Sequence, residues 1–99
     1  MSKSNGNSNK APDFLKEGDG FVDVTLARPA KFNGIEMGVV RMREPTVADQ
    51  EATQDSKESD AAREITAFAN LCEASPADIR ALSRRNYHRL QVAFALFTS

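Results

Sequence analysis

The sequence predicts an α+β domain in which a β-hairpin is followed by three or four short α-helices. Three observations predict it. Residues 21–42 alternate apolar and polar side chains on either side of an Asn-Gly pair, which is typical of a hairpin turn. Helix-start boxes follow at Thr46 and Ser75. The final run, residues 87–97, carries apolar side chains at helical spacing.

A disordered N-terminal tail is expected before this domain. Residues 1–10 are dominated by Ser, Asn, Gly and Lys, and such a segment buries too little surface to offset the entropy of ordering. We therefore divide the chain into a tail at 1–20 and one domain at 21–99, with the hairpin at 21–42 and the helical part at 46–98. A core drawn from about 80 residues is marginally stable, which favours a partner or self-association.

The hairpin is expected to present one apolar face. That face would consist of alternating residues: Val22, Val24 and Leu26 in the first strand, and Ile35, Met37 and Val39 in the second. Pro29 should stop the first strand, because proline cannot donate to the ladder. An isolated hairpin is barely stable in water, so this face must pack on something else.

The segment that links the hairpin to the helices is expected to be a structural joint. Pro45 stops the second strand, and Thr46 has the spacing to cap a helix with Asp49 reaching back. Arg43 and Glu44 precede this step and can pair with charges on either half of the molecule. The alternative is that Arg43 and Glu44 are ordinary surface residues.

The helical half begins with a segment that the sequence leaves open. Residues 49–60 are almost wholly polar and suit either a solvated helix or a mobile linker. An apolar stripe at helical spacing follows, comprising Ala61, Ile65, Phe68, Ala69 and Cys72. Ser75 then caps a helix that has Pro76 at its first position and Asp78 completing the box. A further start signal, Ser-Arg-Arg-Asn, opens the last helix.

No catalytic, cofactor or metal site is expected. His88 is the only histidine and Cys72 the only cysteine, so a zinc site cannot be completed. A Cys-His nucleophile pair is left open, with a core cysteine and a surface histidine as the simpler interpretation. The single cysteine forms no intrachain disulfide, and no apolar run reaches membrane-spanning length. We expect a soluble, intracellular protein without a membrane partner.

Charge is distributed unevenly along the chain. Glu44–Glu64 holds seven acids and two bases, whereas Ile79–Ser99 holds four arginines and no acid. The arginines permit an alternative function, a small DNA-binding regulator with a helix-turn-helix-like C-terminal half, in which Asn86 and Gln91 would be the base-reading amides. The formal net charge of −1 argues against nucleic-acid binding, because binding domains carry a stronger basic surface.

The last helix is the expected partner-binding element. Its apolar stripe comprises Tyr87, Leu90, Phe94 and Phe97. Leu96 and Phe97 point in different directions and are hard to bury together, and a helix that is apolar on more than one side usually buries the second side in a partner. The basic residues that would steer an acidic partner are Arg84, Arg85 and Arg89.

Residues 22–97 resemble the tail assembly chaperones of Mu-like and related contractile-tailed phages. The most specific match is Arg43-Glu44-Pro45-Thr46, between a strand pair with an Asn-Gly turn and an acidic helix. The next is the C-terminal helix, with Tyr87, Leu90 and Phe97. The chain departs from the family pattern at three places: Gln50, Ala74-Ser75 and Asn86.

The resemblance implies a non-catalytic chaperone that acts in the cytoplasm of the infected cell and is absent from the mature virion. Its partner would be the tape measure protein, a long helical rod that the chaperone keeps soluble until tail tube subunits polymerise around it. The tail tube protein is a possible second partner, and self-association is expected. No nucleic-acid partner is implied.

Overall fold

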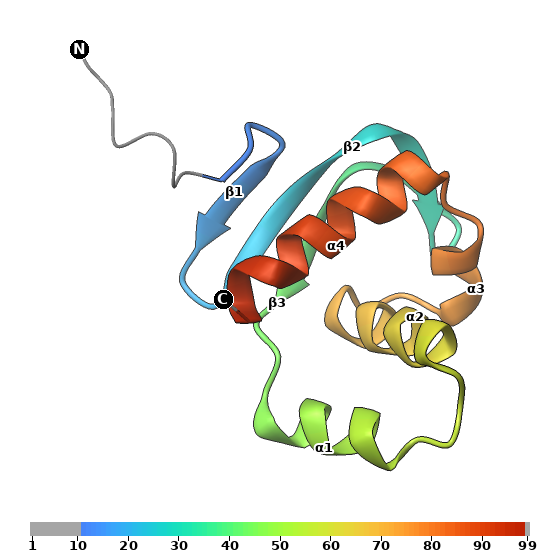
Figure 1. The fold of residues 1–99 in the computed structure, drawn as a ribbon. Helices are drawn as coiled ribbons and strands as arrows, with labels where there is room; N and C mark the ends of the chain where they lie inside the picture. The colour runs from blue at the N-terminus through green and yellow to red at the C-terminus, as the bar shows by residue number, and fades with distance from the viewer. Residues whose placement is uncertain (1–10, 99) are drawn as a thin grey trace.

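The computed structural model describes residues 11–98, which form an antiparallel sheet followed by helices (Figure 1). In chain order the elements are β1 (Leu15–Gly18), β2 (Phe21–Phe32), β3 (Ile35–Arg43), α1 (Val47–Asp55), α2 (Asp60–Leu71), α3 (Pro76–Arg80) and α4 (Arg84–Thr98). The sheet has three strands in the order β1-β2-β3. The predicted α+β class, with strands first and four helices after them in the described part, is confirmed.

The first strand lies inside the stretch that the sequence predicted as tail. β1 pairs antiparallel with the start of β2, and its Leu15 is buried in the core. Gly20, with a φ of 84°, supplies the turn between the two strands. The tail predicted at 1–20 was therefore wrong for residues 15–18, which belong to the sheet. Residues 1–10 lie outside the described residues.

The second and third strands form the predicted hairpin. Asn33 and Gly34 make its turn with φ values of 55° and 82°, which is the positive region that an Asn-Gly pair favours. The predicted inward residues of β2, namely Val22, Val24 and Leu26, are all buried. This half of the hairpin therefore has the apolar face that the alternation predicted.

An irregular stretch between Thr25 and Ala30 shifts the register of β2 against β3. Pro29 lies in this stretch, so it interrupts the ladder without ending the strand, contrary to the prediction. An irregularity of this kind changes the alternation of inward and outward residues, because β2 has residues 26–29 where β3 has only Gly38, and the extra residues are left unpaired.

The inward face of β3 differs from the prediction for this reason. Val40 and Met42 are buried, whereas Ile35 and Val39 are 66% and 48% exposed. Met37 is half-buried. The predicted face of Ile35, Met37 and Val39 was therefore wrong at its first and last positions. The two inward residues of β3 pair with inward residues of β2 on the regular side of the irregular stretch.

Asn86 on α4 binds the irregular stretch of β2. Its side chain is 1% exposed. Its Oδ1 accepts hydrogen bonds from the N–H groups of Ala27 and Arg28 at 2.8 and 3.3 Å, and its Nδ2 donates to the Arg28 carbonyl at 2.9 Å. Arg89 Nη1 donates to the Thr25 carbonyl at 2.8 Å. Side chains of α4 therefore bind main-chain groups of the strand where its regular pairing with β3 is interrupted.

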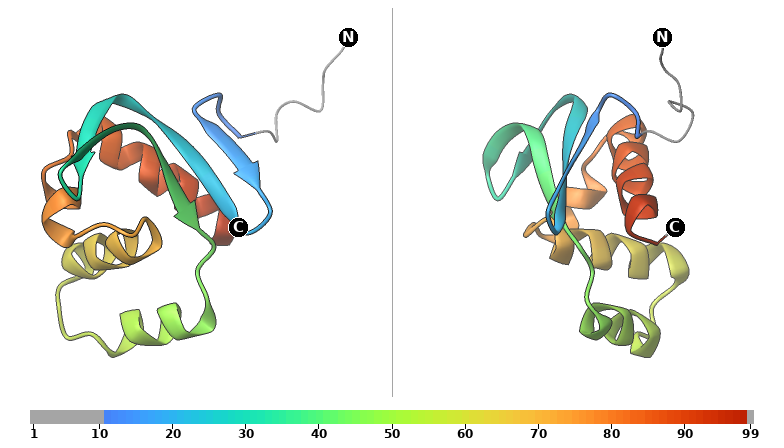
Figure 2. Two further views of the ribbon diagram at one scale, coloured as in Figure 1. Left: turned by 180° about the vertical axis from the view of Figure 1, so that it is seen from behind. Right: turned by 90° about the vertical axis from the view of Figure 1, so that its left-hand side faces the viewer.

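The helices α2 and α4 pack on one face of the sheet, with α4 running along β2 (Figures 1 and 2). Phe68 of α2 contacts both Tyr87 and Phe94 of α4, with its ring centroid 5.5 Å from each of theirs. Tyr87 and Phe94 are two helical turns apart on the same side of α4, so one ring from α2 fits between them. Leu90 and Ala93, at the centre of the same helix, are fully buried.

The first helix stands apart from the rest of the molecule. Residues 47–55 are helical, which settles the segment that the sequence left open. The helix α1 buries none of its residues, and it projects away from the sheet in all three views (Figures 1 and 2). Thr46 and Asp49 form the predicted capping box at its start. A short loop then leads to α2, which Ser59 caps.

The contacts of Asn86 give the first prediction. Replacing Asn86 by Ala should lower the free energy of unfolding by about 2–4 kcal/mol, because three main-chain hydrogen bonds to this buried amide are lost. Urea denaturation followed by circular dichroism measures this. Gln91→Ala, which removes an exposed amide of α4 with one bond to Glu64 of α2, is the control and should cost less than about 1 kcal/mol. Equal losses in the two variants would contradict the assignment.

Candidate partner-binding groove

Arg43 and Asp49 join the end of β3 to the start of α1. The Nη1 and Nη2 atoms of the guanidinium lie 2.7 and 3.1 Å from the two carboxylate oxygens. The same carboxylate accepts the Thr46 N–H at 2.7 Å and the Thr46 hydroxyl at 3.0 Å. The hydrogen bonds from Arg43 and Thr46 hold the pKa of Asp49 well below its usual range. Strand end, helix cap and ion pair therefore share one carboxylate.

Glu44, next to Arg43, takes part through its backbone. The Glu44 N–H donates to the Gly20 carbonyl at 2.9 Å, and the Glu44 carbonyl accepts from Arg43 Nη1 at 3.4 Å. The Glu44 carboxylate is exposed and has no polar partner among residues 11–98. Pro45 is half-buried. We propose that Arg43, Pro45 and Thr46 set the angle between hairpin and α1, with Glu44 contributing through its main chain.

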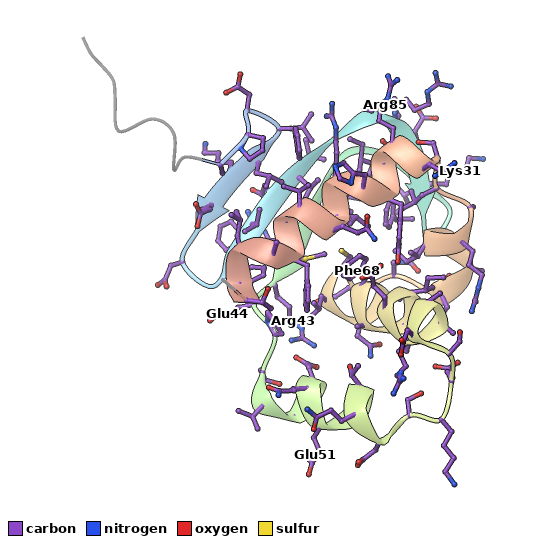
Figure 3. All side chains as sticks on the ribbon, viewed as in Figure 1. Lys31, Arg43, Glu44, Glu51, Phe68 and Arg85 are labelled. Atoms are coloured by element: carbon purple, nitrogen blue, oxygen red, sulfur yellow. The ribbon has the colours of Figure 1, made fainter. Side chains whose placement is uncertain are left out.

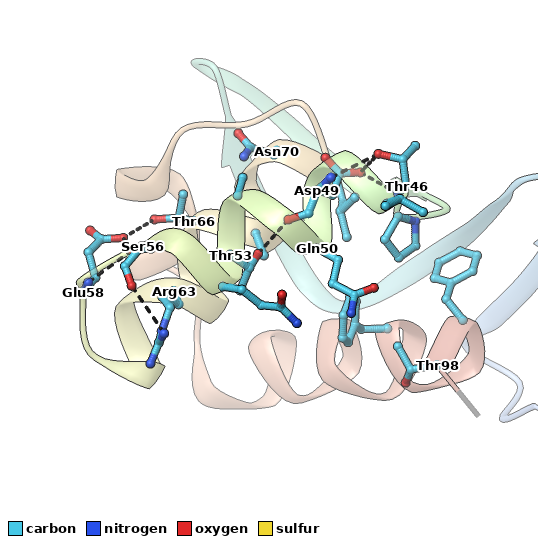
Figure 4. A pocket seen from close by; sticks show the side chains of 18 residues that line it. Thr46, Asp49, Gln50, Thr53, Ser56, Glu58, Arg63, Thr66, Asn70 and Thr98 are labelled. Carbon is cyan, nitrogen blue, oxygen red and sulfur yellow. Dashed lines mark hydrogen bonds between the residues drawn. The ribbon is translucent and has the colours of Figure 1, made fainter.

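A groove of about 660 Å3 separates α1 from α2 and the end of α4 (Figure 4). Its lining comes from three helices and the joint: Pro45, Thr46, Val47, Asp49, Gln50, Ala52, Thr53, Gln54, Ser56, Glu58, Arg63, Thr66, Ala67, Asn70, Leu71, Phe94, Phe97 and Thr98. The joint closes one end of the groove. The other end is closed by the loop after α1, where Glu58 accepts from Thr66 at 3.4 Å.

The floor and the wall of this groove differ in polarity. On the floor, the apolar residues are Ala67 and Leu71 of α2 and Phe94 and Phe97 of α4. On the wall, α1 presents the amides of Gln50 and Gln54 and the hydroxyl of Thr53, besides Val47, Asp49 and Ala52. A polar face of this kind gains little by closing onto aromatic rings, since its amides would lose water without gaining partners. The polarity of α1 therefore explains why the groove is open.

The four residues of the predicted partner-binding stripe differ in burial and in whether they line the groove. Leu90 is fully buried and is a core residue. Tyr87 and Phe94 are half-buried in the ring cluster around Phe68. Of the four predicted residues, only Phe94 and Phe97 line the groove. The sequence identified the stripe but could not show which part of it the sheet and α2 cover.

The predicted basic residues lie at the opposite end of α4. Arg84 and Arg85 are exposed, and Arg85 points away from the body of the molecule (Figure 3). They line a second, more open cleft of about 940 Å3 with Arg80, His88 and Tyr87. Arg89 is engaged within the fold: besides its bond to β2, its guanidinium carbon lies 4.4 Å from the centroid of the Phe14 ring.

A comparison with protein families identifies the chain. The model of the family described as phage tail assembly chaperone proteins, E, or 41 or 14, matches residues 23–99. The chain belongs to this family. The resemblance drawn from the sequence is thus confirmed, and the protein has a role in phage tail assembly. No curated protein and no solved structure gave a significant match.

The fold of this tail assembly chaperone disfavours the alternative of a DNA-binding regulator. Asn86, one of the two amides that would read bases, is buried and bound to β2. The helix α4 that carries it packs along the sheet, so it cannot present that face to a DNA groove. The buried role of Asn86 was missed from the sequence, where a single Asn among arginines gives no sign of burial.

The single cysteine and the single histidine of the chaperone lie in different environments. Burial raises the pKa of the Cys72 thiol to about 12, which suits a core residue rather than a nucleophile. His88 is exposed. Residues 11–98 contain no group of three or more His, Cys, Asp or Glu side chains that could hold a metal ion. Within the same range, no helix has the length and apolar character needed to cross a membrane.

The joint of the chaperone gives the second prediction. Asp49→Asn should lower the free energy of unfolding by about 1 kcal/mol at neutral pH, mostly through weaker capping, because exposed ion pairs contribute little. Since the pKa of Asp49 is lowered by folding, this difference should be present above pH ~4 and should disappear as pH falls further. Thermal unfolding at a series of pH values measures it.

Glu44→Ala is the matched control for this test. Its carboxylate has no polar partner in the described range, so the change should alter stability by less than about 0.5 kcal/mol. A larger loss for Glu44→Ala than for Asp49→Asn would mean that the Glu44 side chain, and not the Asp49 carboxylate, holds the joint.

The ring cluster gives the third prediction. Burial raises the pKa of Tyr87 above its ordinary value. The hydrogen bond that the Tyr87 hydroxyl donates to Glu64 raises it further. Tyr87 is the only tyrosine, so phenolate absorbance reports it alone. It should ionise well above pH ~10 in the folded chaperone and near that value in urea. The protonated form is favoured by folding, so stability is kept below pH ~10 and lost above it.

Glu64→Gln tests the origin of this shift. The variant removes the carboxylate charge, so the folded-state pKa of Tyr87 should move back toward its ordinary value. An unchanged titration in Glu64→Gln would assign the shift to burial alone.

Proposed function

We propose that this chaperone binds the tape measure protein and keeps that long helical rod soluble until the tail tube forms around it. The role is one of binding and involves no chemical reaction. The chaperone acts in the host cytoplasm and is left out of the mature virion. The tail tube protein, which displaces it, is a second partner in the same process.

The observation that supports this proposal is a pair of half-buried rings, Phe94 and Phe97, near the C-terminal end of α4. Phe94 and Phe97 line a groove that no segment of residues 11–98 fills. A rod with exposed apolar stripes would aggregate before assembly. Apolar residues of one helix, presented at a groove, can cover such a stripe by helix-in-groove packing.

The contact must also be reversible, since tube subunits later replace the chaperone. A site with two rings offers a small apolar area, so each contact is weak. Many copies along the rod, aided by self-association, would raise overall occupancy without a tight single contact. The exposed Arg84 and Arg85 would speed association with acidic segments of the rod.

Co-expression with the tape measure protein tests this function. The rod should be insoluble alone and soluble with the chaperone, and Phe97→Gln should reduce the soluble fraction about tenfold by removing an apolar contact. Ile35→Gln is the control, because Ile35 is an apolar residue, 66% exposed, that lies outside the groove. The soluble fraction is measured by centrifugation and gel densitometry.

Two outcomes would contradict the proposal. One is a rod that stays insoluble with the wild-type chaperone. The other is a loss of solubility with Ile35→Gln and not with Phe97→Gln, which would move the binding face to the hairpin. Finding the chaperone in purified virions would contradict its release and favour a structural role.

A further inference from the structure

We propose that the groove between α1, α2 and the end of α4 binds one amphipathic helix of the partner, and that this helix carries basic residues along the side that faces α1. This inference rests on the proposed function and deepens it. It names the chemistry of the bound segment. It also proposes that α1, a helix outside the apolar stripe of α4, selects which segment binds.

The groove has the two-sided polarity of a site for an amphipathic helix. Phe94 and Phe97 of α4 and Ala67 of α2 form an apolar floor, while Gln50 and Gln54 line the groove from α1. Figure 4 labels Gln50 on that helix. Direct closure of wall onto floor would press amides against rings. An inserted helix avoids this, because its apolar stripe meets the rings and its polar flank meets the amides.

The backbone of the groove favours a helix over an extended peptide. Its walls are helices whose main-chain groups are already bonded within each helix. An extended segment would bury N–H and C=O groups with no main-chain partner to receive them. A helix satisfies its own backbone bonds and needs only side-chain contacts from the groove.

The charge around the groove selects basic side chains. From Glu44 to Asp60 there are six acids and one base, and α1 itself carries three acids and no base. Among these, Asp49 and Glu58 line the groove. Glu51 and Asp55 are exposed on α1 outside the lining and have no polar partner in the described range. Both lie on a helix about 10 Å wide, so their field reaches across the wall within a Debye length at physiological salt.

The one cation among the lining residues is already neutralised. Arg63 Nη2 lies 2.5 Å from Asp60 Oδ1, and its Nη1 donates to the Ser56 carbonyl at 3.4 Å. Lysine or arginine on the α1 side of the bound helix would therefore be attracted by the net negative charge of this wall, and an acidic flank would be repelled. This end of the molecule is thus opposite in sign to the cleft at Arg84 and Arg85.

Filling the groove tests where the helix binds. Ala67→Trp places an indole on the floor, so affinity for the tape measure protein, measured by biolayer interferometry with full-length chains, should fall about tenfold or more. Ala61→Trp adds the same ring at an exposed position of α2 outside the groove and should stay within about twofold. Circular dichroism confirms that both variants are folded.

Changing the charge of the wall tests the chemistry, with no risk to the core. Gln50 and Gln54 are exposed and lie one turn apart on α1. The double variant Gln50→Lys/Gln54→Lys should weaken binding, and Gln50→Glu/Gln54→Glu should preserve or tighten it. The difference should shrink between about 50 and 300 mM salt. If α1 has a purely structural role, both double variants should change the affinity in the same direction.

The outcomes separate this inference from the proposed function. If wild-type chaperone binds the rod and Ala67→Trp binds equally well, the groove is not the site, while the function stands. If the lysine variant binds more tightly than the glutamate variant, the bound segment is acidic and the proposed chemistry is wrong. If the wild type binds no tape measure protein, both the function and this inference are overturned.

Discussion

The fold depends on one buried amide. Asn86 of α4 binds main-chain groups of Ala27 and Arg28 in the stretch where β2 loses its regular pairing with β3. Main-chain groups left without partners at the contact with α4 would cost free energy, and a side chain of matching geometry on α4 removes that cost. The amide carries both a donor and an acceptor, which a leucine or an alanine at this position would lack. It therefore fixes α4 along the sheet, and with α4 it fixes the position of Phe94 and Phe97.

A second consequence follows for α1. With α4 held by the sheet and by Phe68, the core is complete without α1, which buries nothing and is anchored at its start by the Asp49 carboxylate. Hydrogen bonds and an exposed ion pair set direction without requiring close packing. The chain thus keeps a polar helix at a distance from its own aromatic residues. An apolar α1 would have collapsed onto Phe97 and removed the groove.

The parts of this arrangement that follow local rules could be predicted from the sequence. The turn at Asn33, the helix boxes at Thr46 and Ser75, and the burial of Val22 and Val24 depend on neighbours in the chain, and each was found as predicted. The predictions failed where residues distant in the sequence determine the local structure. Leu15 gives too short an alternation to predict β1, and Pro29 was expected to end a strand that Asn86, 57 positions further on, helps to continue. The same holds for the site: spacing placed Phe94 and Phe97 on one stripe, but only packing shows that Leu90 lies under the sheet.

The position of α1 also bears on the energetics of binding. A groove closed by apolar packing must be opened before a partner can enter, and that cost subtracts from affinity. Here the wall is already separated from the floor, and its residues are in contact with water, so a partner helix displaces solvent rather than protein. Because α1 buries no residue, small shifts of its position lose few contacts. Under the proposed function, this would let one groove fit successive segments of a long helical partner whose side chains differ in size, with each contact weak enough to be displaced. A rigid, deep pocket would instead bind one such segment tightly.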